Sequence, residues 1–274
     1  METLRPYLAV FRARFQLMLQ YRVAALAGFA TQCWWGAIRV MVFAAFYGAN
    51  AAAAPIRFAD AVTYVWLGQA LLALLPWLAD PEIALAVRTG SVGYDRLRPL
   101  GAYGYWYARS LAWMLARALP RATLMALAAG IVMPLAGLGA WAWRPPSGIA
   151  AALLFIPAFA LMVALSGAVL TLANVIVASS LNERGVNAVL TPLVVIFSGC
   201  LLPLDFFPDD LRMFLHEQPF AGLVDIPFRI YFAGLRGRAA LEGLALQAAW
   251  TLIVVAIGRL AMGRMMRRLE MQGG

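Results

Sequence analysis

Six apolar segments of membrane-spanning length fill most of this chain, and the connections between them carry arginine. A run of about 20 apolar residues crosses lipid as a helix, because the hydrocarbon offers the backbone no outside hydrogen-bond partner. With 64% hydrophobic and 13% charged residues, a soluble domain of 274 residues would lack the polar surface to cover itself. The sequence therefore predicts an all-α polytopic membrane protein. The six expected spans cover about residues 23–49, 60–78, 118–137, 148–177, 186–204 and 240–262.

An amphipathic segment precedes the first span. Residues 1–22 place apolar side chains on one helical stripe, with Arg5, Arg12 and Arg14 off that stripe. This pattern predicts a helix on the membrane surface. Because the same arginines interrupt any apolar core of a signal peptide, we expect no cleavage here.

Two longer connections complete a single membrane domain over residues 1–274. Residues 80–117 mix arginine with glycine and proline, which predicts short helices broken by loops. Residues 205–239 begin with Pro208-Asp209-Asp210, a helix-start signal, and continue into an apolar stretch that is too short to span. We expect two short re-entrant helices there, at the outer face.

The distribution of arginine predicts the orientation. Fourteen of the 22 arginines fall in residues 1–22, 80–121, 178–187 and 263–274, and six fall in the opposite loops. Basic residues mark the cytoplasmic side of membrane proteins. Both termini are therefore expected in the cytoplasm, and the net charge of +9 needs no nucleic-acid partner to explain it.

All basic residues are arginine, and the absence of lysine excludes several kinds of chemistry. The loop that binds ATP phosphates needs a lysine, as do Schiff-base and Ser-Lys catalysis. The only histidine is His216, and no expected span interior carries a carboxylate. We therefore predict no catalytic residues, no metal site and no cofactor bound by this chain.

The same reasoning separates two kinds of transporter. Ion-driven carriers place an ionisable carboxylate at mid-membrane, whereas a subunit powered by a separate ATPase needs a path and a docking surface. The segment 87–99 is the candidate docking surface. A solvated loop that follows the positive-inside rule is the other interpretation, and spacing alone leaves both open. The candidate docking residues are Arg88, Thr89, Ser91, Tyr94, Asp95, Arg96 and Arg98.

Polar and aromatic residues inside the expected spans are candidates for a path. A charged side chain at a helix centre costs about 2.5–3.5 kcal/mol on insertion scales, so Arg39 is expected to avoid lipid. It lines a path or subunit interface, or it binds buried carbonyls or Gln32. The side-chain amides of Gln69 and Asn174 either line a path or link helices by hydrogen bonds. The candidates for a translocation path or permease interface are Gln32, Trp35, Arg39, Gln69 and Ser198.

Several stretches resemble the permease subunits of type-two ATP-binding-cassette (ABC) exporters. Residues 197–208, which read Phe-Ser-Gly-Cys-Leu-Leu-Pro-Leu-Asp-Phe-Phe-Pro, are similar to the end of span five and the re-entrant outer helices of that family, and residues 219–220 and 227–231 continue the likeness. Residues 88–99 and 267–274 resemble a smaller, viologen-exporter-like bacterial branch. The outer-region residues that carry the likeness are Pro203, Asp205, Phe206, Phe207 and Pro208.

The resemblance implies an ATP-driven exporter in the bacterial cytoplasmic membrane. Residues 87–99 would then be a coupling helix that touches a separate ATPase dimer, which holds ATP and Mg. A second permease, identical or homologous, would complete the path within membrane lipid. The alternatives are a stand-alone secondary transporter driven by an ion gradient and a membrane scaffold that transports nothing. The substrate is not specified.

Overall fold

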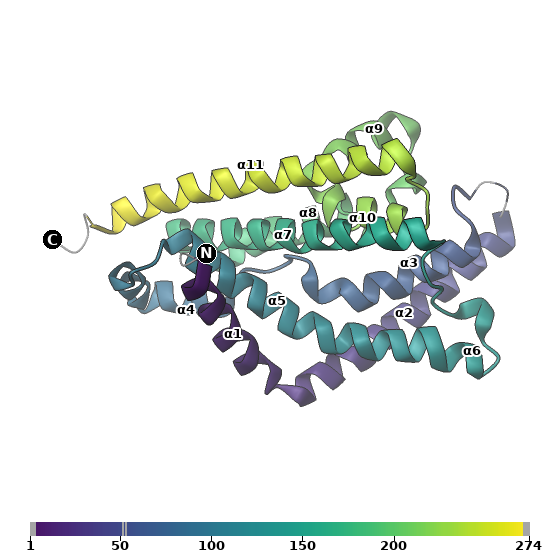
Figure 1. The fold of residues 1–274 in the computed structure, drawn as a ribbon, viewed down its shortest axis with the longest axis horizontal. Coiled ribbons are helices and arrows are strands. Elements are labelled where there is room, and N and C mark those ends of the chain that lie inside the picture. The colour runs from purple at the N-terminus through teal and green to yellow at the C-terminus, as the bar shows by residue number, and fades with distance from the viewer. Residues whose placement is uncertain (1–3, 51, 53, 271–274) are drawn as a thin grey trace.

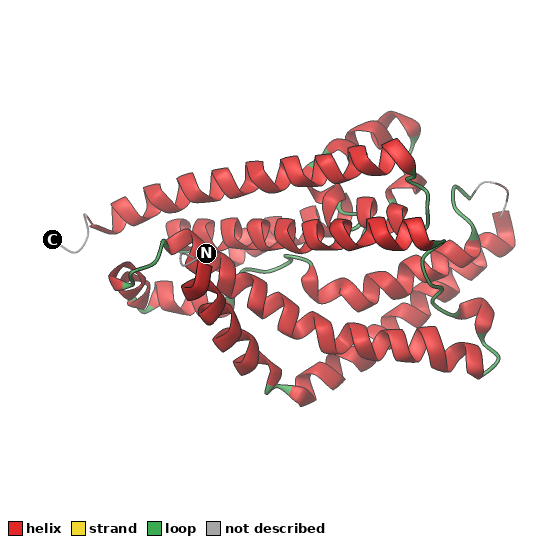
Figure 2. Ribbon diagram, viewed as in Figure 1, coloured by secondary structure: helices red, strands yellow, loops and turns green. Residues whose placement is uncertain are grey.

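A computed structural model describes residues 4–50, 52 and 54–270, with every side chain in these ranges except those of residues 50, 96 and 268–270. Over these residues the secondary structure is helix joined by short loops, without a strand (Figure 2). The fold class is therefore all-α. The α-helices are α1 (Arg5–Leu19), α2 (Arg22–Asn50), α3 (Phe58–Leu71), α4 (Pro81–Arg88), α5 (Ala102–Leu127), α6 (Met133–Leu135), α7 (Ile149–Ser180), α8 (Glu183–Phe197), α9 (Asp209–Glu217), α10 (Asp225–Tyr231) and α11 (Gly237–Glu270).

Among the described residues, four helices are long and apolar enough to cross a membrane. This finding indicates a multi-pass membrane protein. Three of the four, α2, α7 and α11, coincide with spans expected from the sequence. The four candidate spans are Arg22–Ala49, Ala102–Leu135, Ile149–Ser180 and Gly237–Arg267.

The helix around the third expected span begins earlier than the sequence predicted. We expected that span over residues 118–137, but α5 starts at Ala102 and continues through a π-helical turn, η5 (Ala128–Val132), into α6. The first turns of α5 are aromatic and are buried against the rest of the protein, as Trp106 at 0% exposure shows. Tertiary burial therefore stabilises helix in a segment whose sequence is typical of a loop. The prediction of short helices and loops over residues 80–117 holds only for residues 80–101, because residues 102–117 belong to α5.

The remaining two expected spans are shorter helices. Helix α3 and a 3₁₀ turn, η3 (Leu72–Leu74), form a 17-residue apolar helix over Phe58–Leu74, and α8 has 15 residues. Helix α3 ends because Pro76 forces Leu75 into an extended conformation. The indole of Trp77 then donates to the Leu72 carbonyl at 2.9 Å and satisfies one of the carbonyl groups at the end of the helix.

The helices run side by side along the long axis of the molecule (Figure 1). Helix α3 packs against α2 and α5 and is buried on most of its surface, while α7 lies along α11 and α1 packs on α5. Figure 1 places α1, α4 and the last turns of α11 at one end of the bundle, and α6 and α9 at the other. The two ends carry different groups of polar side chains.

Candidate functional site

The predicted coupling segment folds as two short helices joined by a tight turn. Helix α4 ends at Arg88, and the 3₁₀ helix η4 (Ser91–Leu97) follows. Gly90 between them has φ +72°, a left-handed conformation that costs glycine least. The Thr89 hydroxyl donates to the Leu85 carbonyl at 3.0 Å and lies 3.0 Å from the Ser91 hydroxyl. The segment is therefore an ordered structure at the end of the bundle.

One side of this segment is buried and the other is open. Val92 is 5% exposed and joins a buried cluster with Ile83 and Trp106. Tyr94 and Leu97, in contrast, are 70% and 80% exposed. An aromatic and an aliphatic side chain therefore project from a turn that also carries charged residues.

The charged residues of the segment hold it to its neighbours. Asp95, 12% exposed, accepts hydrogen bonds from Arg98 Nε at 3.1 Å and from the Trp106 indole at 3.0 Å. Arg98 lies over the Tyr105 ring, 4.6 Å from its centroid. Arg88 reaches Glu183 at the start of α8, at 3.4 Å. Asp95 thus anchors the segment to α5, and the Arg96 side chain lies outside the described residues.

Beneath the segment lies a group of charges that we call the Asp80 cluster, made of the buried Arg14 and Asp80 with the more exposed Glu82 and Arg109. Arg14, 8% exposed, comes from α1 and places Nη1 2.7 Å from Glu82 Oε2 and Nη2 3.8 Å from Asp80 Oδ2. Arg109 of α5 approaches the same Glu82 oxygen at 3.3 Å. The cluster therefore joins α1, the start of α4 and α5.

Asp80 is the most buried charge of this cluster, at 0% exposure. Its Oδ1 caps α4 by accepting from the Glu82 N–H at 2.9 Å, and its own N–H donates to Asn174 Oδ1 of α7 at 2.8 Å. Within the described part of the chain, Oδ2 has no hydrogen-bond partner. Burial raises the pKa of the Asp80 carboxyl, and the Glu82 N–H, Arg109 and Arg14 oppose that shift.

The extended residues before Asp80 are fixed in the same way. The Ala79 N–H donates to Asn187 Oδ1 at 2.9 Å, and the Trp77 carbonyl accepts from the Thr191 hydroxyl at 2.8 Å, both from α8. Non-helical backbone among apolar helices needs such partners. Asn174, for which the sequence left open a path or a link between helices, is therefore a link, and the base of the coupling segment is bonded to α1, α5, α7 and α8.

The sequence signals for the Asp80 cluster were incomplete. Asp80-Pro81-Glu82 carries an N-cap, a proline at the first helical position and an acidic first turn, all of which the structure uses. The partner Arg14 stands off the apolar stripe of α1, and this position is the only sequence hint of its role. Neither signal identifies Arg14 and Asp80 as neighbours.

The predicted path residues do not form a single site. Gln32 and Gln69 are 4% and 3% exposed, and the side-chain oxygens of both lack a hydrogen-bond partner among the described residues. Gln32 lines a cavity of about 130 Å³ beside Arg117 and Arg121. Trp35 is 56% exposed on α2. Helix α3 is enclosed by its neighbours, so Gln69 faces other helices of this chain, and its assignment to a path or a permease interface stays a prediction.

Arg39 and Ser198 are both engaged near the end of α8. The Arg39 guanidinium donates to the backbone carbonyls of Cys200 and Leu201. Of the interpretations that the sequence left open for Arg39, these contacts match the one in which it binds carbonyl groups. Ser198, 0% exposed, accepts from the Cys200 N–H at 3.1 Å. These contacts join α2 to the loop after α8.

The outer-region residues fold into a 3₁₀ turn, η7 (Leu204–Phe206), and the short helix α9. Phe206 packs on Phe43 and Phe46 of α2, with ring centroids 5.8 Å apart in each pair. Pro203 precedes the 3₁₀ turn and Pro208 precedes α9, so both prolines stand at helix starts. The Phe207 carbonyl accepts from Arg212 at 3.2 Å. The helix start predicted at Pro208-Asp209-Asp210 is confirmed.

A second charged group lies in this region, and the sequence did not reveal it. His216 Nε2 lies 3.3 Å from Asp205 Oδ1, and Nδ1 lies 3.0 Å from Oδ2 of Asp225, which is 1% exposed. Arg229 approaches the same two carboxylates at 3.8 and 3.5 Å. Hydrogen bonds to Asp205 and Asp225 raise the pKa of His216 to about 9, and the His216 hydrogen bond lowers the pKa of Asp205. Two cations therefore balance two anions around η8 (Pro219–Leu223) and α10.

Comparison of the whole chain with known proteins adds no assignment to this geometry. No protein-family model matches the chain, and no curated protein matches it significantly.

Proposed function

We propose that this chain is the membrane subunit of an ATP-driven exporter, and that residues 87–99 couple it to a separate ATPase. The observation that carries the proposal is the contrast between the two sides of that segment. Its outer side exposes Tyr94 and Leu97, and its base is bonded through the Asp80 cluster to α1 and α5. A docking surface on a rigid base can pass a displacement to the helices it is bonded to.

The proposal includes six membrane crossings. Helix α3 with its extended continuation to residue 78, and helix α8, would add two crossings to the four candidate spans. Both termini would then lie in the cytoplasm, at the end of the bundle that carries α4, and residues 205–239 would form the re-entrant outer region. The resemblance to bacterial exporters favours the cytoplasmic membrane as the location.

A second permease, identical or homologous, would pack on α2. This helix exposes large apolar side chains, including Trp34 at 68%, Trp35 at 56% and Val42 at 64%. Such a face suits either lipid or another apolar helix. We place the second subunit there because Arg39 and Phe206 fix the same helix to the outer region, so that movement at this interface would reach the outer region directly.

The first test is to purify the full chain gently from its native membrane and to identify the proteins that accompany it. We expect a stoichiometric ATPase with a phosphate-binding loop, which supplies ATP and Mg chemistry that a chain without lysine lacks. Isolation without such an ATPase, under conditions that keep a reference ABC complex intact, would contradict the proposal.

Single substitutions then test the docking surface. Tyr94→Ala and Leu97→Asp remove exposed side chains that make no hydrogen bond among the described residues, so the fold should tolerate them. We expect each to reduce co-purification of the ATPase at least about tenfold, as the loss of an interface anchor does. Tyr21→Ala, a tyrosine 62% exposed at the α1–α2 corner, is the matched control and should leave co-purification unchanged. Equal effects at Tyr94 and Tyr21 would show that the segment is not the docking surface.

Ion-gradient transport by the chain alone is the second candidate, and Asp80 favours it. This carboxyl is fully buried, its pKa is raised, and one oxygen has no hydrogen-bond partner among the described residues, as in proton-relay groups. The chain reconstituted alone would then transport in response to a pH gradient, and Asp80→Asn would abolish that transport. The exporter proposal expects no transport without the ATPase.

A further inference from the structure

A groove of about 760 Å³ lies between α1, α5 and α11, and none of the proposed transport steps uses it. Its volume lies in the range of about 300–1,000 Å³ that is typical of small-molecule sites. Leu4 and Leu8, 62% and 55% exposed, form one wall from α1, and Met262 and Met266 contribute to another from α11. The groove is open on one side and mostly apolar.

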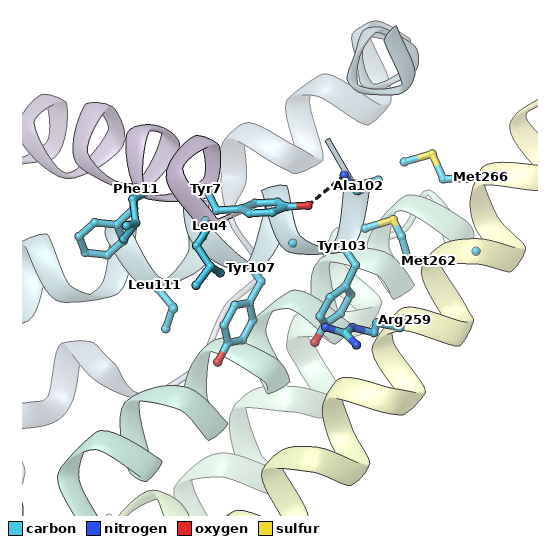
Figure 3. Close-up of a pocket in the computed structure, with 15 residues that line it drawn as sticks. Leu4, Tyr7, Phe11, Ala102, Tyr103, Tyr107, Leu111, Arg259, Met262 and Met266 are labelled. Atoms are coloured by element: carbon cyan, nitrogen blue, oxygen red, sulfur yellow. Dashed lines mark hydrogen bonds between the residues drawn. The ribbon is translucent and has the colours of Figure 1, made fainter. Parts of the chain in front are cut away.

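Two polar side chains stand together in this apolar lining. The Arg259 guanidinium lies 5.8 Å from the centroid of the Tyr103 ring, and Figure 3 shows the two side chains next to each other. Among the residues that the structure describes, no carboxylate forms an ion pair with Arg259. Tyr103 is 8% exposed, and its hydroxyl has no hydrogen-bond partner in the same residues. The hydroxyl oxygen is enclosed by its neighbours, whereas Arg259 is exposed, so the arginine is the polar group that an anion in the groove can reach.

The polar pair lies in the part of the groove near the start of α5, with Met262 and Met266 of α11 beside it. Tyr103 is the second residue of α5, so the polar pair lies level with the first turn of that candidate span. In Figure 3, Phe11 and Leu111 lie at the opposite end of the groove, deeper along α5. The Tyr107 hydroxyl points away and donates to the Ala164 carbonyl at 2.9 Å. This order, with charge at the interface and apolar surface deeper in the membrane, matches the polarity of a membrane lipid.

The walls of the groove are fixed by close contacts. The Tyr7 hydroxyl accepts from the Gly101 N–H at 3.1 Å, and a Cβ at Gly104 would lie 2.7 Å from the Tyr7 ring. A Cβ at Gly258 would lie 2.6 Å from the Tyr103 ring, so this tyrosine is held against the backbone of α11. The groove is therefore a built feature of the helix packing.

We propose that an anionic phospholipid occupies this groove, with its phosphate bound by Arg259 and an acyl chain lying along Leu8, Phe11 and Leu111. A phosphate would give Arg259 the anionic partner that no described carboxylate provides. The lipid would seal α1 against α11. The site is independent of the transport mechanism, because it needs neither the ATPase nor residues 87–99.

The test uses the full chain, delipidated in detergent and supplied with phosphatidylglycerol or with phosphatidylcholine of the same acyl chains. Native mass spectrometry counts the lipids that remain bound. Wild-type protein should retain phosphatidylglycerol in preference to phosphatidylcholine. Arg259→Gln should reduce phosphatidylglycerol retention about tenfold. Arg264→Gln changes an exposed arginine on the same helix that does not line the groove, and should have no effect.

A second pair of variants tests the acyl part of the site. Gly263 lines the groove and has no atom within 4 Å of an added Cβ, so Gly263→Phe should fill the groove without strain and displace lipid. Gly48→Phe, at an equally open position on α2, is the control. Equal retention of the two lipids by wild-type protein, or equal effects of Arg259→Gln and Arg264→Gln, would overturn the proposal. Undiminished lipid retention in Gly263→Phe would overturn it as well.

Discussion

Replacing Arg14 by methionine is the sharpest test of the Asp80 cluster. Methionine keeps most of the side-chain length and removes the charge, so Asp80 loses its nearest cation in α1 and Glu82 loses its 2.7 Å partner. Asp80 is completely buried, and Arg109 pairs only with Glu82 among the described residues. The substitution therefore leaves the buried Asp80 carboxylate with Arg109 as its remaining counter-charge and without an ion pair.

The expected cost follows from these exposures. Removal of one partner from a buried ion pair destabilises proteins by about 3–5 kcal/mol. Glu82 is 49% exposed and keeps Arg109, so solvent and the second arginine compensate part of the loss. We expect about 3 kcal/mol, the lower end of that range. For a chain of this size the apparent unfolding midpoint should fall by about 6–12 °C.

Thermal unfolding of the detergent-solubilised chain, followed by circular dichroism at a fixed scan rate, measures this shift. Arg12→Met is the matched control, because Arg12 is exposed on the same helix and forms no ion pair with a described residue. The double variant Arg14→Met with Asp80→Asn should recover about 1–2 kcal/mol relative to additivity, since the uncompensated charge is gone. Equal midpoints for Arg14→Met and Arg12→Met, or strict additivity in the double variant, would refute the reasoning.

Three further perturbations test other parts of the structure. The pKa of His216 is raised from 6.5 to about 9, so its protonation contributes stability that is complete below pH 6.5 and is lost as the pH rises through 9. The thermal unfolding midpoint should fall over this window by an amount equivalent to at most about 3 kcal/mol. His216→Gln should remove that pH dependence. Arg39→Gln should destabilise the chain by about 1.5–3 kcal/mol through the lost charge-assisted bonds to Cys200 and Leu201, whereas Arg22→Gln should not, as denaturant titration would show. Gly104→Val places side-chain atoms against the Tyr7 ring, so amide hydrogen exchange in α1 should speed up relative to a Gly48→Val control.

The sequence predicted the long apolar helices well because their signal is local. Length and composition locate α2, α7 and α11, and the Asp80-Pro81 and Pro208-Asp209 signals locate the starts of α4 and α9. The start of α5 was missed because its first turns carry Arg109 among aromatic residues, which reads as a connection. In the structure, Arg109 lies over the Tyr105 ring and pairs with Glu82, so helix formation there depends on partners that local sequence does not show.

The two charged clusters were beyond sequence reasoning for the same reason. The rest of α1 and all of α2 and α3 separate Arg14 from Asp80 and Glu82 in the sequence. Asn174 of α7 is further from Asp80 along the chain. His216, as a single histidine, gives no pattern that could predict Asp205 and Asp225 on either side of it. Both clusters are sets of long-range contacts between single polar residues, and periodicity contains no information about such pairs.

The placement of these bonds also bears on how a force at the coupling segment would travel. Local bending of residues 75–99 would break buried bonds to Asn174, Asn187 and Arg14, each worth about 1–3 kcal/mol when a partner is left unsatisfied. Movement of the segment together with α1, α5, α7 and α8 leaves these bonds intact and changes mainly apolar contacts between helices. The rigid displacement therefore costs less than the local one. Under the proposed function, the Asp80 cluster is then what converts a push on Tyr94 and Leu97 into a tilt of the bundle, and the Arg14→Met variant should uncouple ATP hydrolysis from transport while leaving ATPase binding intact.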